Sequence, residues 1–281
     1  KRNVSDYAEL VKVVLRTKAS KIFQAFFVFY LFGAMTNFQI VGSHFLQEFL
    51  NKGLGIHCNL VYSFWQRTIQ IIIVNILLYG LARFKSIQSF RSIAVITFTI
   101  LVYIVMILLI ETPAYLEQNF EASKVKLVSF EPTFLSAYAI TAYSFFSQAL
   151  ILPVKEGLEN PTVSKMNRII RRGVGTIWIL YVIMASAAYL SLLELTPHTI
   201  PDRKALKGTR DYAMNFGRLL LTLNLMFGVA LRLNPIKTQL YKMLEKPQSN
   251  YWNEVFTFVL LGFSAVLAIL FPNIYAAITI I

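Results

Sequence analysis

The sequence predicts an all-α integral membrane protein with about seven transmembrane helices, and three observations favour that class. First, 56% of the 281 residues are apolar and only 15% are charged, whereas about a quarter of the residues in a soluble domain are charged. Second, the apolar residues gather in long segments that approach or exceed the ~20 residues needed to cross ~30 Å of hydrocarbon. Third, the charges lie mostly between these segments, as expected when lipid surrounds the segments.

The chain is predicted to be a single transmembrane domain over residues 1–281 that begins with a surface helix. In residues 6–21, Tyr7, Leu10 and Val14 recur at helical spacing, while Lys12 and Arg16 fall on the opposite face. This pattern is typical of an amphipathic helix lying at the membrane interface; a helix on the surface of a soluble domain is the alternative.

The predicted spans follow this surface helix. Their approximate ranges are 22–45, 60–82, 92–110, 132–154, 173–193, 212–233 and 255–281. The span 212–233 has a short apolar centre bracketed by Arg218 and Arg232. We expect the Arg232 side chain to extend to the lipid headgroups. Pro235 lies just beyond this span, at a segment end, where its missing N–H is least harmful to a helix.

The loop charges predict the orientation of the chain. When the loops are assigned alternately to the two sides, about two thirds of the 27 Lys and Arg residues fall on the side of the N-terminus. Because cytoplasmic loops carry an excess of basic residues, this side is predicted to be the cytoplasm, or the matrix of a mitochondrion. Arg203 and Arg218 fall on the opposite side. The mitochondrial inner membrane, the plasma membrane and the vacuolar membrane all remain candidates.

The same composition argues against several classes of function. The net charge is +13, but the basic residues lie at segment ends and form no groove-sized patch, so the predicted partner is the lipid bilayer and not a nucleic acid. Cys58 is the only cysteine, and His44, His57 and His198 stand alone in the sequence, so neither an intrachain disulfide nor a metal site is predicted. Glu111 lies at a segment end and is expected to be solvated. Without a nucleophile or phosphate-loop motif, no enzyme, catalytic residue or cofactor is predicted.

Motifs in and after the predicted span 132–154 resemble a known family. Residues 143–148 read Tyr-Ser-Phe-Phe-Ser-Gln, residues 152–158 read Leu-Pro-Val-Lys-Glu-Gly-Leu, and residues 159–162 read Glu-Asn-Pro-Thr before a basic run at 165–172. These motifs resemble the amino acid/auxin permease family of transmembrane amino acid transporters, and in particular its sodium-coupled neutral amino acid transporters. Further stretches resemble other spans of that family in the same order, namely Leu31–Met35, Gly80–Phe84, Arg218–Lys237 and Phe271–Ile274.

The resemblance implies a leucine-transporter-like fold of inverted five-helix repeats. In such a fold the substrate site lies at mid-membrane between the broken first and sixth helices, and the eighth helix contributes to the ion site. The chain resembles the family from its third to its ninth span, so we expect only part of that fold, with spans one, two, ten and eleven missing.

Several positions depart from the family pattern. Gln148 stands where the family has a histidine, and Lys155 stands where it has a tyrosine. Met226 and Gly228 align with hydroxyl residues that ligate sodium in the family, and a thioether is a poor ligand for a hard cation. Because residues 134–152 contain neither Gly nor Pro, the helix there is predicted to have no easy place to unwind.

The resemblance implies a set of substrate-binding residues, if transport survives. The candidates are Tyr143, Ser144, Phe145, Ser147, Gln148 and Asn224. Each also has a packing interpretation, because hydroxyl and amide side chains inside spans either line a cavity or form hydrogen bonds between helices.

Three functional hypotheses follow. The first is a degenerate structural or accessory subunit of a larger membrane complex, whose partners are other membrane-protein subunits; the altered positions and the missing spans favour it. The alternative is an active secondary transporter of neutral amino acids, coupled to sodium or protons, whose remaining spans lie outside residues 1–281. The third is a hetero-oligomer in which another chain supplies the missing helices.

Overall fold

The structure is a computed structural model, and it describes most of the helical part of the chain. The described ranges are 17–53, 64–82, 87–126, 133–145, 160–197, 199–206, 211–245 and 249–270, with single positions or pairs at 11, 151, 154–155, 158 and 247. Within these ranges every regular element is a helix. The predicted surface helix at 6–21 lies almost wholly outside the described residues, and only its last residues appear, as the start of the first long helix.

The described residues form α-helices that follow the order of the predicted spans. Their bounds are α2 Thr17–Gly53, α3 Phe64–Ala82, α4 Ile87–Asn119, α5 Thr133–Ser144, α7 Val163–Leu192, α8 Tyr212–Met243 and α9 Asn250–Leu270. Short 3₁₀ turns lie at Ala122–Lys124 (η1), Leu193–Leu195 (η2) and Ile200–Asp202 (η3). In this part of the chain, α2, α4, α7, α8 and α9 are long and apolar enough to cross a membrane. The other two predicted spans correspond to shorter helices, α3 and α5.

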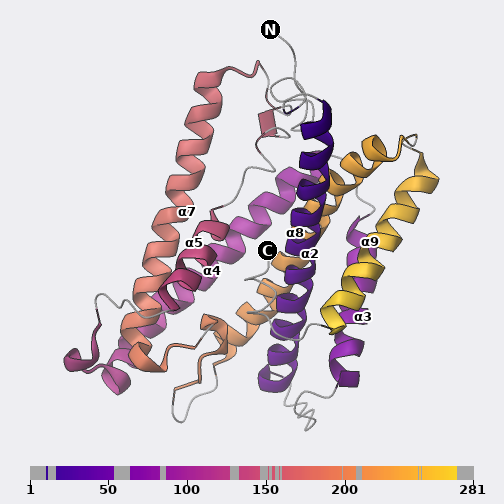
Figure 1. The fold of residues 1–281 in the computed structure, drawn as a ribbon. Coiled ribbons are helices and arrows are strands. Elements are labelled where there is room, and N and C mark those ends of the chain that lie inside the picture. Colours follow the sequence, from indigo (N-terminus) through magenta and orange to yellow (C-terminus); the bar gives the residue numbers. More distant parts are fainter. Residues whose placement is uncertain are drawn as a thin grey trace.

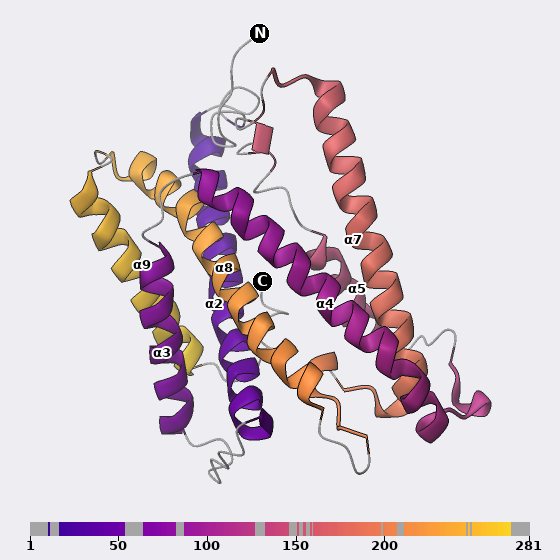
Figure 2. The same cartoon turned by 180° about the vertical axis from the view of Figure 1, so that it is seen from behind.

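Helices α2 and α8 form the centre of the molecule and run side by side in opposite directions (Figure 1). Their contact is more extensive than that of any other pair of described elements. Helices α3 and α9 pack on one side of this pair, and α4 and α7 form a wing on the other side, as Figure 2 shows from behind. The main apolar core lies between α2, α3, α8 and α9, where Met35, Leu78 and Leu233 are fully buried.

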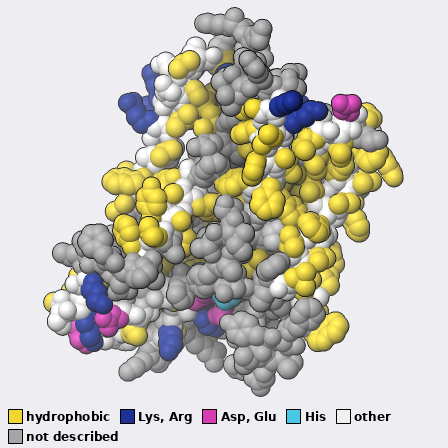
Figure 3. Space-filling view, viewed as in Figure 1, with side chains coloured by type: hydrophobic (Ala, Val, Ile, Leu, Met, Phe, Trp, Pro, Cys, Tyr) yellow, Lys and Arg dark blue, Asp and Glu magenta, His cyan; other side chains and the backbone are white. Residues whose placement is uncertain are grey.

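The outer surface of the helices is apolar, as the sequence predicted for lipid-facing residues. Phe26 is 70% exposed, Ile110 71% and Phe258 70%. In Figure 3 hydrophobic side chains cover much of the visible face, while Lys, Arg, Asp and Glu gather toward its two ends. An exposed apolar surface of this extent is unfavourable in water and fits a protein that lies in a bilayer.

Pro235 does not end a helix, in contrast to the sequence-based expectation. It lies inside α8, which continues to Met243. Proline removes one backbone N–H from the helix, but the neighbours Leu233 and Ile236 are fully buried against other helices. Packing on both sides of the proline therefore holds the helix together, as is common in membrane spans.

The span predicted at 132–154 is not one continuous helix in the structure. Helix α5 contains 12 residues and ends at Ser144, followed by a turn at Phe145; residues 146–150 lie outside the described ranges. The helix ends at Ser144 without Gly or Pro, and its last turns carry two side-chain hydrogen bonds. The Ser144 hydroxyl donates to the Thr141 carbonyl at 2.7 Å, and the Thr141 hydroxyl donates to the Ala137 carbonyl at 2.8 Å. At about 18 Å, α5 is too short to cross the hydrocarbon by itself.

Candidate functional site

A close approach between α2 and α8 places polar and aromatic groups together inside the membrane. The Thr222 hydroxyl donates to the Gly42 carbonyl at 3.3 Å, and a Cβ on Gly228 would lie 2.4 Å from the Phe38 ring. Small residues at such a contact allow two helices to approach closely in lipid. Gly228 is therefore required by the position of the Phe38 ring.

Arg232 lies in this contact, one helical turn beyond Gly228. The centre of its guanidinium is 3.9 Å from the centroid of the Phe38 ring, which is a cation–π contact. Its Nη1 donates to the Gly228 carbonyl at 3.1 Å. The Tyr143 hydroxyl of α5 and Tyr30 of α2 also face the guanidinium. Arg232 thus connects the three helices α2, α5 and α8.

The side chain of Arg232 points back along α8 toward Gly228, and not toward the C-terminal end of the helix, where the sequence-based expectation put it. Arg232 lies about 7 Å from the midpoint of α8, on the side of the helix C-terminus. Its guanidinium donates to Gly228, which precedes it in the helix, so the side chain points away from the nearer membrane surface. The aromatic ring of Phe38 and the Gly228 carbonyl hold it there. An ionisable group in this location is a strong indication of function in a membrane protein.

Helix α5 brings two predicted site residues toward this cluster and its surroundings. The Tyr143 ring meets the Tyr30 ring edge-on, with centroids 6.4 Å apart. The Phe145 ring, at the turn that ends α5, meets Tyr181 of α7 at 5.5 Å. Ser144 is exposed, and its hydroxyl donates a hydrogen bond to the Thr141 carbonyl. Of these residues, Tyr143 contacts the Arg232 cluster, whereas Phe145 links α5 to the α7 wing.

The other candidates are placed unevenly. Ser147 and Gln148 lie outside the described residues. Asn224 is half-buried in α8, and it lies on the same face of the helix as Gly228 and Arg232 because the three are spaced four residues apart.

Sequence analysis missed Tyr30 and Phe38 as partners of Arg232. Only the presence of an arginine within a span could have indicated the cluster, because the contacts are made across three helices.

A second polar cluster lies at the end of the bundle where α8 begins. Arg203 is only 2% exposed, and its Nη2 pairs with Glu111 of α4 and, at 3.2 Å, with Asp211. Its guanidinium also stacks on the Tyr115 ring, 4.6 Å from the centroid. The expectation that Glu111 is solvated was therefore wrong: Glu111 ties the loop before α8 to α4. Burial lowers the pKa of Arg203 and the charge of Asp211 opposes that effect, and Arg203 stays charged.

Arg218 anchors the same loop from within α8. It is 2% exposed, and its Nε and Nη2 donate to the Pro201 carbonyl at 2.8 and 2.6 Å. Its Nη1 donates to the Asn215 side chain at 3.0 Å. Asn215 in turn approaches Gly53 so closely that a Cβ there would lie 2.0 Å from its Nδ2. Arg218 is thus a structural anchor and not a solvated loop charge.

His44 of α2 also holds this loop, although the sequence showed it standing alone. Its Nε2 lies 3.0 Å from both carboxylate oxygens of Asp202, and the Thr199 hydroxyl donates to the same carboxylate. Burial by itself would raise the pKa of Asp202, but the hydrogen bonds from His44 and Thr199 outweigh it, so the pKa lies below its usual 3.8. The ionised carboxylate therefore stabilises the attachment of η3 to α2.

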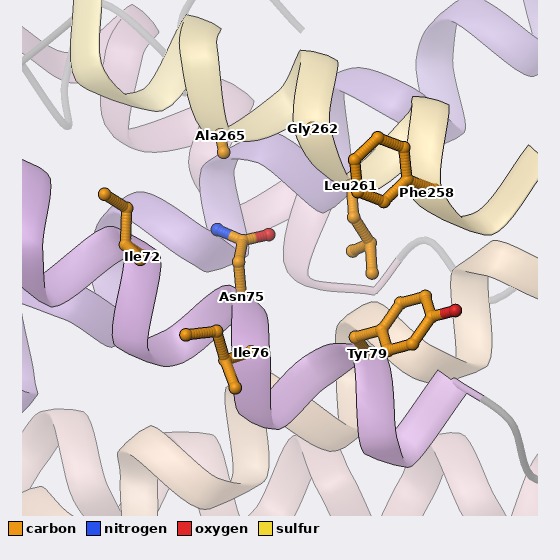
Figure 4. Close-up of a pocket in the computed structure, with 8 residues that line it drawn as sticks. All are labelled: Ile72, Asn75, Ile76, Tyr79, Phe258, Leu261, Gly262 and Ala265. Atoms are coloured by element: carbon orange, nitrogen blue, oxygen red, sulfur yellow. The ribbon is translucent and has the colours of Figure 1, made fainter.

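A groove of about 480 Å³ runs between α3 and α9 (Figure 4). It is lined by Ile72, Asn75, Ile76 and Tyr79 from α3 and by Phe258 and Gly262, among others, from α9. The Asn75 amide is engaged at both ends: its Oδ1 accepts from Gln39 at 3.0 Å and its Nδ2 donates to the Ile71 carbonyl at 2.8 Å. The apolar residues at the rim are exposed like the rest of the lipid-facing surface. The groove therefore opens to hydrocarbon and not to the Arg232 cluster.

Metal chemistry finds no support in the described part of the chain. No group of three or more His, Cys, Asp or Glu residues there is placed to hold a metal ion. The carboxylates of the second cluster are occupied by arginine and histidine partners.

The packed apolar helices, the polar cluster inside the membrane and the short α5 define a polytopic membrane protein of the transporter class. The whole chain, residues 1–281, matches the family described as transmembrane amino acid transporter protein. The chain belongs to this family, which confirms the resemblance at family level. No curated protein and no solved structure gives a significant match to the chain.

Proposed function

We propose that the protein transports neutral amino acids across a membrane, and that the contact of α2, α5 and α8 forms part of the substrate path. The observation that carries the proposal is the family match over the whole chain. The polar cluster of Arg232, Tyr143 and Tyr30 supports it, because polar groups within spans are costly and occur where solutes bind or move.

The end of α5 supports the same proposal. Transporters with discontinuous helices use the free backbone groups at the helix ends to bind solutes. α5 stops at Ser144, and the next residue, Phe145, forms a turn near the Arg232 cluster. In this proposal α5 is the first half of a broken helix within a leucine-transporter-like arrangement of inverted repeats.

The accessory-subunit hypothesis remains as a second candidate, because of Met226. This residue stands where the resembled family has a sodium-ligating hydroxyl. It is 3% exposed and packs in the apolar core with Leu31 and Val229. A thioether enclosed by apolar side chains offers no oxygen to a hard cation. Coupling of transport to sodium would then be lost. Two possibilities follow: transport coupled to protons, or a non-transporting role as a subunit of a larger membrane complex, for example in mitochondria.

Uptake into proteoliposomes separates the two candidates. The full-length protein is reconstituted, and uptake of labelled neutral amino acids is followed under an inward sodium gradient, an inward proton gradient or no gradient. We expect uptake that exceeds that of liposomes without protein and that excess unlabelled amino acid inhibits. Absence of uptake under all three conditions would contradict transport and favour the accessory role.

A further inference from the structure

Arg232 is a largely enclosed charge without an opposite charge among the residues that the structure describes. Arginine stays protonated even when buried. None of the carboxylates of the described residues forms an ion pair with it, whereas Arg203 pairs with two. Ionisable residues within a membrane are almost always paired with one another or with a polar partner. The positive charge of Arg232 is therefore available to an anion that the described residues do not provide.

The geometry around the guanidinium also favours a carboxylate. Arginine has five N–H donors in a planar fork that matches both oxygens of a carboxylate. One N–H of the Arg232 guanidinium donates to the Gly228 carbonyl, and one face of the guanidinium lies against the Phe38 ring. The contact with Phe38 fixes the plane of the fork, so less conformational freedom is lost when a ligand binds. The Tyr143 hydroxyl, beside the guanidinium, is a further hydrogen-bond donor.

We propose that Arg232, with the Tyr143 hydroxyl beside it, binds the carboxylate group of a small solute in the contact of α2, α5 and α8. This inference rests on the proposed function and deepens it, since it names the side chain that holds the carboxylate end of the transported amino acid. The apolar surroundings strengthen the interaction because water competes weakly there. A carboxylate can reach this position either on a free amino acid or on a fatty acid from the bilayer.

Ligand-induced stabilisation tests the proposal on the full-length protein in detergent. The probes are a panel of neutral L-amino acids, the carboxamide of each, which lacks the carboxylate, and oleate. We expect at least one amino acid to raise the unfolding temperature while its carboxamide does not. Arg232→Gln should weaken that binding about tenfold or more, since a hydrogen bond to a charged group contributes about 1.5–3 kcal/mol. Arg232→Lys should keep part of the affinity, and Tyr143→Phe should cause a smaller loss.

Arg171→Gln is the matched control variant. Arg171 is an exposed residue of α7, so its substitution should leave ligand binding unchanged. A second measurement needs no variant: phenylglyoxal modifies accessible arginine side chains, and mass spectrometry follows the adduct on Arg232. The stabilising amino acid should slow modification of Arg232 and leave modification of Arg171 unchanged.

The outcomes separate this proposal from the proposed function. Equal stabilisation by the carboxamides, full binding by Arg232→Gln, or stabilisation by neither the amino acids nor oleate would overturn the carboxylate site. Stabilisation by oleate alone, lost in Arg232→Gln, would keep the site and assign it to a lipid, against amino acid transport. If the Arg232→Gln variant still takes up the amino acid and still does not transport its carboxamide, the role of Arg232 is overturned, whereas transport by the protein stands.

Discussion

Two arginines of α8, the buried Arg218 and the half-buried Arg232, differ in what surrounds them. Arg218, near the start of the helix, has three donors engaged by the Pro201 carbonyl and the Asn215 side chain, and the carboxylate of Asp211 lies nearby. Arg232 lies about four turns further on. It donates to the Gly228 carbonyl and lies against the face of the Phe38 ring. The first arginine is enclosed in its own protein partners. The second is held in place but lacks a counter-charge among the described residues.

This difference separates structural from functional use of the same side chain. A buried charge that is fully hydrogen-bonded fixes the elements around it, and removal of one partner is costly. A buried charge without an anion is unfavourable in the absence of ligand, so a folding requirement alone does not explain it. Residues 199–203 before α8 are therefore locked to the bundle, whereas the contact of α2, α5 and α8 keeps a charge available.

The largest effect is expected for Arg218→Met. The substitution leaves the buried Pro201 carbonyl and the Asn215 side chain without their donors, so we expect a loss of stability on the order of 3 kcal/mol. Thermal unfolding in detergent, followed by circular dichroism, measures the change. A midpoint equal to that of the unmodified protein would show that the loop does not depend on Arg218.

A smaller loss is expected for Gly228→Ala. The added Cβ would meet the Phe38 ring at 2.4 Å, and displacement of this ring costs about 1–3 kcal/mol. Gly80→Ala in α3 is the control, since no atom lies within 4 Å of a Cβ there and alanine favours a helix by up to about 1 kcal/mol. We expect Gly228→Ala to lower the unfolding midpoint and Gly80→Ala to maintain or raise it. Equal behaviour of the two variants would contradict the close approach of α2 and α8.

Arg232→Met should change the stability of the protein less than Arg218→Met does. We expect it to leave the stability unchanged or to raise it. Replacement of an uncompensated buried charge by an apolar side chain of similar length is commonly neutral or stabilising. We expect a change within about 1 kcal/mol, or a gain, when no ligand is present. A loss as large as that of Arg218→Met would mean that Arg232 is structural too, and the contrast between the arginines would fail.

The smallest effect concerns pH and the link between His44 and Asp202. Because the pKa of Asp202 is lowered in the folded protein, its ionised form stabilises the fold above the unfolded pKa, and this contribution is lost as pH falls through the folded pKa. Asp202→Asn should therefore unfold at a lower temperature than the unmodified protein at pH 7, and the two midpoints should begin to converge only as pH falls below about 4, the unfolded pKa. A constant difference between pH 7 and pH 3 would exclude this titration as the cause.

The sequence predicted the membrane class, the order of the helices and the family, because each depends on apolar segments and motifs that are local in the chain. It did not predict that α5 ends at Ser144, because residues 134–152 contain neither Gly nor Pro to mark that end. It also gave Glu111 a solvated position, and it did not predict the partners of His44 and Arg232. Their partners Arg203, Asp202 and Phe38 lie on other elements, and the pairing exists only once α2, α4 and α8 have packed together.

Water access to Asn224 tests the central claim that the contact of α2, α5 and α8 is a solute-binding site. Cys58 is the only cysteine, so Cys58→Ser provides a background in which Asn224→Cys carries a single thiol on the helix face of Arg232. Gly262→Cys, in the lipid-facing groove of α9, is the control. We expect a membrane-impermeant, charged thiol reagent to modify Asn224→Cys but not Gly262→Cys, and a transported amino acid to slow that reaction. Modification of neither thiol, or a rate at position 224 that amino acids leave unchanged, would contradict the account.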